Sequence, residues 1–112
     1  KFSGEVTGAL AERDFQLLAA IVSELGDGGV FLNIGSAVIL PEVFLKAVSY
    51  CAAQGIALEQ FHTAVFDFHR LYRPQENVCR RPTARGGKGF YFVGPHEILV
   101  PLLAAMILNR HA

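Results

Sequence analysis

The chain is poor in several residue types, and its charges cancel. It has no tryptophan, one methionine and two cysteines, and its 10 lysines and arginines balance 10 aspartates and glutamates. A net charge of zero argues against a general nucleic-acid binder, because such a domain usually carries a clear basic excess. Cys51 and Cys79 have neither metal-ligand nor redox spacing. We therefore expect reduced cysteines in a cytoplasmic protein, with a single disulfide as the alternative.

Long apolar runs and histidine motifs are also missing. The longest apolar run, from Ile98 to Leu108, is interrupted by Pro101 and falls well short of the ~20 residues of a membrane span. We therefore expect no membrane association. No secretory signal opens the chain, and a start at Lys1 without methionine favours a piece of a longer protein. Three histidines show no metal-ligand spacing and are expected to be structural or surface residues: His62, His69 and His111.

The length and the apolar content predict one domain with a sizeable core. The chain has 112 residues, of which 52% are hydrophobic, and nine of these are phenylalanine. That fraction is slightly above the usual ~45–50% of globular proteins. The excess indicates either a large apolar interior or apolar surface that another chain covers. In the second case the chain forms a homo-oligomer or packs against the remainder of a longer protein.

Helical and strand patterns alternate along the sequence. Apolar residues at helical spacing are separated by short apolar runs, of which those at 30–34 and 90–93 end at glycine. The expected order is a helix at 14–25, a strand at 30–34, a helix at 41–54, a strand at 63–68, a long basic loop, a strand at 90–93 and a helix at 98–109. Strands that alternate with helices in this way predict a single α/β domain over residues 1–112, with a mainly parallel, short sheet.

Most of the positive charge lies between Arg70 and Lys88, opposed by a single acid, Glu76. Guanidinium groups bind phosphates and carboxylates through two parallel hydrogen bonds, and glycines allow close approach of the backbone. We expect an anion-binding loop made by Arg80, Arg81, Arg85, Gly86 and Gly87. The alternatives are a solvated loop and a salt-bridged contact between subunits.

A second group of candidates follows the strands. In open α/β sheets, ligands bind beyond the carboxyl ends of the strands. Gly35 and Ser36 follow the first strand and could offer backbone N–H groups to an anion, or form an ordinary tight turn. His96 and Glu97 begin the last helix, where they either cap it or contact a ribose or another hydroxyl group. The complete dinucleotide fingerprint and the hydrolase nucleophile elbow are both absent.

Two residues are candidates for catalysis. Lys88 lies in a glycine-flanked loop near other cations, and it is either a nucleophile or proton carrier, or a solvated loop lysine. Asp67 lies in an aromatic run at the expected end of a strand. It is either a catalytic carboxylate or the partner of a nearby arginine.

The order of these motifs resembles the C-terminal half of the deoxyhypusine synthase family. The matching segments cover most of residues 14–109 and are Gly29–Ser36, Thr63–Phe68, Gly86–Gly89, Pro95–Glu97 and Pro101–Ala104. The resemblance implies a Rossmann-like fold, NAD as the cofactor and, if the chain is an enzyme, an NAD-dependent transferase. Lys88 stands where that family has its catalytic lysine.

The chain departs from the family in its substrate loop. Residues 36–42 contain none of the histidines that help to form the family's substrate pocket, and the tryptophan before the Gly-Lys pair is missing. Arginines replace the acidic loop that holds a polyamine, and arginines repel a cationic amine. We therefore expect a different, anionic small-molecule ligand.

The sequence leads to two hypotheses. The first is a Rossmann-like domain that binds a nucleotide or another phosphorylated ligand; the alternative is a non-catalytic oligomerisation or assembly domain. Convergence of Gly35, Ser36, His96 and the arginine loop would favour ligand binding, whereas separated groups would favour assembly. RNA binding is the weaker third option, because Tyr72 is the only aromatic residue interleaved with the basic ones.

Overall fold

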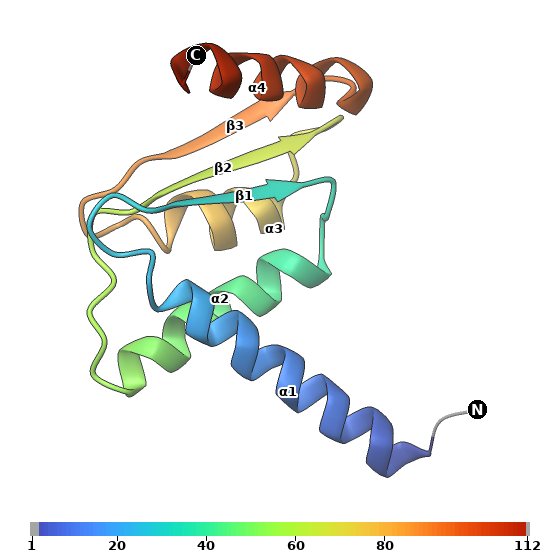
Figure 1. Ribbon diagram of the computed structural model, residues 1–112, viewed down its shortest axis with the longest axis vertical. Helices are drawn as coiled ribbons and strands as arrows, with labels where there is room; N and C mark the ends of the chain where they lie inside the picture. The colour runs from blue at the N-terminus through green and yellow to red at the C-terminus, as the bar shows by residue number, and fades with distance from the viewer. Residues whose placement is uncertain (1–2, 112) are drawn as a thin grey trace.

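The computed structural model describes residues 3–111, in which helices flank a three-stranded sheet (Figure 1). In chain order the elements are α1 (Gly4–Val22), β1 (Val30–Ile34), α2 (Ile39–Ala53), β2 (His62–Asp67), α3 (Tyr72–Pro74), the π-helix η1 (Gln75–Arg80), β3 (Gly89–Val93) and α4 (His96–His111). None of these helices is long and apolar enough to cross a membrane.

The three strands are parallel and lie in the order β1-β2-β3. Val30 is opposite His62 in the first pair, and Thr63 is opposite Gly89 in the second. This arrangement confirms the predicted α/β class, with a short, parallel sheet flanked by helices. It is compatible with the Rossmann-like expectation.

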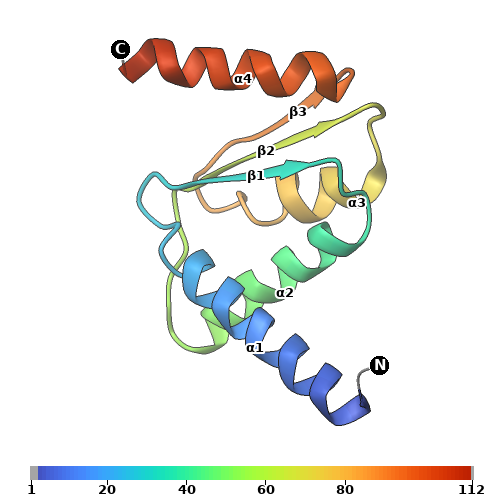
Figure 2. The same cartoon turned by 45° about the vertical axis from the view of Figure 1, so that its right-hand side comes forward.

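The central strand β2 is buried on both faces. Its residues Thr63 to Phe66 are all buried, as expected for a parallel strand that reads as an apolar run. Side chains with odd numbers on β1 point to the face that α2 and η1 cover, whereas α4 lies over the opposite face (Figures 1 and 2). Helix α1 packs against the outside of α2.

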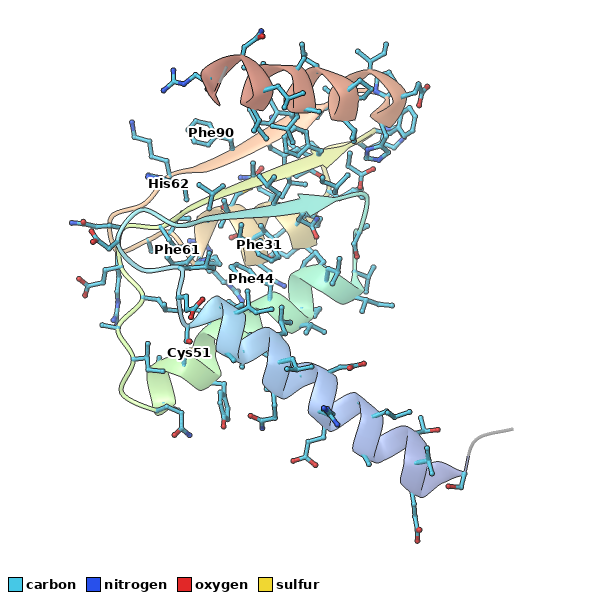
Figure 3. The ribbon with its side chains drawn as sticks, in the orientation of Figure 1. Phe31, Phe44, Cys51, Phe61, His62 and Phe90 are labelled. Atoms are coloured by element: carbon cyan, nitrogen blue, oxygen red, sulfur yellow. The ribbon has the colours of Figure 1, made fainter. Side chains whose placement is uncertain are left out.

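The core lies between the sheet and the layer of α2 and η1. Phe44 of α2 is fully buried, and its ring stacks on Phe31 of β1 with centroids 3.8 Å apart (Figure 3). The ring of Phe61 meets Phe44 edge-on at 6.3 Å. Val78 of η1 is also completely buried, so the segment after β2 closes the same core.

The basic segment after β2 is largely helical, so the expectation of a long loop there was wrong. The Arg81 N–H donates to the carbonyl oxygen of Glu76 at 2.9 Å, which is the i→i+5 bond of a π-helix. Asn77, Val78 and Cys79 are buried in succession, while Arg80 and Arg81 face solvent. The charged residues flank this short buried stripe, which packs on the sheet.

Several helix boundaries also differ from the expected ones. Helix α1 begins at Gly4 rather than Asp14, and Ser3 caps it by accepting a hydrogen bond from the Val6 N–H at 3.2 Å. Residues 4–14 are exposed, so this half of α1 has no buried stripe that a periodicity search could detect. The helices α2 and α4 each begin two residues earlier than expected.

We predict that Phe44→Ala lowers the free energy of unfolding by about 3–5 kcal/mol, because the cavity would remove the stack on Phe31 and the contact with Phe61. Urea denaturation followed by circular dichroism measures this loss. The control is Ile39→Ala, since Ile39 is 72% exposed and its change should stay within about 0.5 kcal/mol. Equal effects in the two variants would contradict the assigned core.

Candidate functional site at the carboxyl edge of the sheet

The turn after β1 lies against the first residue of α4. Gly35 has φ = +80°, which favours glycine, and its N–H donates to the Phe66 carbonyl at 3.0 Å. A Cβ at this position would lie 3.4 Å from Nε2 of His96. The structure therefore brings the Gly35–Ser36 turn and His96 together, as expected from the carboxyl ends of parallel strands.

Asp67 joins the same cluster from the end of β2. Its Oδ1 lies 3.7 Å from Nε2 of His96 and accepts a hydrogen bond from the Phe68 N–H at 2.7 Å. The ring of Phe68 meets the imidazole edge-on at 5.6 Å. Asp67 is the more buried partner, with 15% of its side chain exposed against 31% for His96. Three adjacent strand ends thus supply a carboxylate, an imidazole and a glycine turn.

Two buried polar atoms of this region have no hydrogen-bond partner among residues 3–111. One is Oδ1 of Asn33, a residue that is completely buried under the turn, where its Nδ2 donates to the Ser36 carbonyl at 2.8 Å. The other is Nδ1 of His96. Sequence reasoning did not select Asn33, although a polar residue inside an otherwise apolar strand is a signal that could have found it.

The start of α2 forms the next part of the site. The Ser36 hydroxyl accepts a hydrogen bond from the Leu40 N–H at 3.1 Å, and the Glu42 N–H donates to the Val38 carbonyl at 3.3 Å. Pro41 has no N–H, so the Ile39 N–H is the first-turn donor without an acceptor inside the helix. Arg73 lies beside this turn, with Nε 3.9 Å from Oε1 of Glu42. Arg73 belongs to the basic segment but was not among the predicted binding residues. Glu97, in contrast, is exposed in the first turn of α4, where its charge complements the helix dipole.

The Gly-Lys loop lies at the opposite, amino edge of the sheet. The Thr63 N–H donates to the Lys88 carbonyl, and the Lys88 N–H donates to Nδ1 of His62, both at 3.0 Å. Asp67 is at the far end of β2, about 13 Å from Thr63 at ~3.3 Å per residue. Lys88, Arg85, Gly86 and Gly87 therefore do not converge on the cluster of Gly35, Asp67 and His96. The expectation of one shared site was wrong, because a loop that enters a parallel strand must lie at its amino end.

The glycines of this loop make room for the backbone. Gly86 has φ = +127°, and a Cβ on Gly87 would overlap the carbonyl oxygen of Phe61. A Cβ on Gly89 would overlap the carbonyl oxygen of Cys79. Close approach of glycine was predicted here, but the group that approaches is the protein's own chain.

Arg81 and Arg85 border a groove beside α2, with a volume of about 260 Å³. Arg80 instead forms an ion pair with Glu76, one turn earlier in η1. The groove is lined by Leu45, Val48, Ser49, Ala52, Ile56, Ala57, Leu58, Arg81, Pro82, Ala84 and Arg85. It is a second place where an anionic group could bind.

Cys51 and Cys79 are both buried, and no disulfide joins them in this structure. Burial raises the pKa of both thiols, and for Cys79 the nearby Arg70 opposes this rise. Burial also raises the pKa of Tyr91, whose hydroxyl donates to the His69 carbonyl at 2.6 Å and accepts from the Leu71 N–H at 3.0 Å. All three groups stay protonated at neutral pH, and the Tyr91 hydroxyl holds the segment after β2 in place.

The other expectations concern metals and the chain start. Between residues 3 and 111, no three histidine, cysteine, aspartate or glutamate side chains gather to hold a metal ion. Lys1 and the side chain of His111 lie outside the described part of the structure.

No family model, curated protein or solved structure matches the chain.

We predict that Gly87→Ala lowers the free energy of unfolding by more than about 2 kcal/mol, because the new Cβ would force the loop away from Phe61. Gly8→Ala is the matched control: its Cβ meets nothing within 4 Å and the position is helical, so stability should rise by up to about 1 kcal/mol. Thermal denaturation tests whether stability falls in Gly87→Ala and rises in Gly8→Ala. A neutral Gly87→Ala would show that the loop is not packed as described.

We predict that stability falls as the pH rises above about 8.5, the ordinary pKa of a thiol. The folded state has the raised pKa, so the unfolded state loses its protons first and is favoured by alkali. Urea denaturation between roughly pH 7 and 9.5 measures the slope. The double variant Cys51→Ala/Cys79→Ala should flatten it, whereas a decline caused by Tyr91 should persist near its ordinary pKa of about 10. An unchanged slope in the double variant would contradict this explanation.

Proposed function

We propose that the chain is a Rossmann-like domain that binds a nucleotide or another phosphorylated small molecule at the carboxyl edge of its sheet. The observation that carries the proposal is the meeting of Gly35, Asp67 and His96 at three adjacent strand ends. The buried, unpartnered Oδ1 of Asn33 lies under the same turn. In parallel α/β sheets this edge is the usual position for a ligand.

Different residues of the site would bind the phosphate and the hydroxyl-bearing part of such a ligand. The Ile39 N–H at the start of α2 would donate to a phosphate oxygen, and the Arg73 guanidinium beside that turn would add charge-assisted bonds. The Asp67 carboxylate would accept hydrogen bonds from hydroxyl groups, as a sugar requires. His96 would complete this side of the site with Nε2, which already faces both Gly35 and Asp67.

The resemblance to deoxyhypusine synthases suggests NAD as the ligand and a transferase reaction as the activity. In this proposal Asp67 is the catalytic candidate, because it lies in the cluster. Lys88 of the same chain is at the other end of β2, so it could act on this ligand only from a second copy. The proposed ligand remains anionic, because the Arg73 guanidinium lies beside the first turn of α2.

Assembly is the second candidate function, and the separation of the arginine loop from the carboxyl-edge cluster favours it. Arg81 and Arg85 point to a groove rather than to the cluster. Exposed apolar side chains of α4, among them Leu102, Met106 and Leu108, also require a partner surface if they are to be buried.

We predict that one ligand in a panel of NAD, NADH, NADP, ATP, CoA and inorganic phosphate raises the melting temperature. A ligand at a hundredfold excess over its Kd adds about 2.7 kcal/mol of stability, which corresponds to a shift on the order of 10 °C. His96→Ala and Arg73→Ala should each abolish most of this shift. Arg85→Ala is the matched control and should keep it.

Two outcomes would contradict the proposal. If the protein is folded and no ligand shifts its melting temperature, nucleotide binding is excluded and assembly is favoured. A shift that is lost in Arg85→Ala but kept in Arg73→Ala would place the ligand in the groove beside α2 instead.

A further inference from the structure

One face of the sheet is only partly covered. Helix α4 lies on it and packs over Phe66 and Phe92, around an apolar pocket of about 150 Å³. Beside this contact the β1 side chains of the same face stay open, with Leu32 39% and Ile34 42% exposed. An apolar strand of a parallel sheet is normally buried on both faces.

The surface of the whole chain is larger than its mass predicts. The accessible surface is 7592 Å², whereas a folded monomer of 12.2 kDa exposes about 6,100 Å². The radius of gyration is 15.3 Å, compared with about 13 Å for a compact chain of this length. The excess exceeds the ~800 Å² that one partner buries in a standard interface.

The free edge of β1 is also unprotected. Gly29 accepts from the His62 N–H and Gly35 donates to the Phe66 carbonyl, so alternate residues of β1 bond to β2. The backbone groups of Leu32 and Ile34 therefore point away from β2. Strand β1 has no charged residue and no proline, the usual means by which an edge strand avoids pairing.

The position of α4 decides at which edge of the sheet a strand after α4 would pair. Helices α2 and η1 lie on one face while the chain steps from β1 to β2 to β3. Helix α4 lies on the other face and runs back toward the amino ends of the strands (Figures 1 and 2). Parallel crossovers are right-handed in about 98% of cases. A connection over the opposite face is right-handed only if it crosses the sheet in the opposite direction, from β3 towards β1. The next strand would then lie beside the free edge of β1.

We propose that the free edge of β1 pairs with a fourth parallel strand, which polypeptide continuing from α4 provides. Its alternate apolar side chains would cover Leu32 and Ile34 and pack against the side of α4 that is now exposed. The strand would turn the Gly35–Ser36 end of β1 from an edge into the middle of the sheet. This inference does not depend on ligand binding, because it rests on crossover handedness, exposed area and the open edge.

Amide hydrogen exchange of the full-length protein tests the proposal. The amides of Leu32 and Ile34 should exchange at least about 100-fold more slowly than open amides, and as slowly as those of Phe31 and Asn33, which β2 already protects. This protection should not change on dilution. Fast exchange of Leu32 and Ile34 would overturn the proposal. Protection that is lost on dilution would also overturn it, since a second copy would then be the partner.

A pair of substitutions provides an independent test. Leu32→Lys places a charge on the covered face and should lower the melting temperature of the full-length protein and release the Ile34 amide. Leu17→Lys is the matched control, because Leu17 is a 55% exposed leucine on α1, on the other side of the sheet. Equal effects of the two substitutions would contradict a covered β1 face.

Discussion

Parallel pairing of β2 with both of its neighbours determines most of what the chain can do. It places every strand start at one edge of the sheet and every strand end at the other. The Gly-Lys loop must therefore lie at the amino edge, and Gly35, Asp67 and His96 must lie together at the carboxyl edge. The same pairing leaves two broad faces to be covered by helices, and only the face under α2 and η1 is fully covered.

The arginines of this neutral chain are dispersed by the fold. Arg80 pairs with Glu76, Arg73 lies beside Glu42, and Arg70 lies over the ring of Tyr91 at 4.9 Å. A cluster that is continuous in sequence thus contributes to several local interactions. Arg81 and Arg85 are the members that the groove beside α2 brings together.

Much of the fold could be predicted, because short apolar runs between helical patterns reveal strands directly. The strands were placed within one residue, and the carboxyl-edge cluster followed from their parallel order. The exposed half of α1 could not be found, since residues that pack against nothing carry no periodic signal. Segment 72–80 was hidden for a different reason: its buried residues are consecutive, as a π-helix allows, and charged residues flank them.

Asn33 could have been selected as a polar residue inside an apolar strand, but its hydrogen bond to the Ser36 carbonyl could not be predicted from that pattern. The location of Lys88 could have been inferred, because any loop that precedes a parallel strand lies at the amino edge. The motif order on which the expected resemblance to deoxyhypusine synthases rests carried no information about which edge each motif occupies.

The π-helix has a consequence for which sequence lengths this fold tolerates. A π-helix holds an additional residue in its turn, compared with an α-helix of the same rise. Loss of one residue between Gln75 and Arg80 would therefore leave a regular α-helix and not a break. The segment after it would keep its direction, because the α-helical turn covers the same rise with one residue fewer. Relatives of this chain can accordingly lack one residue of this segment and keep the rest of the fold.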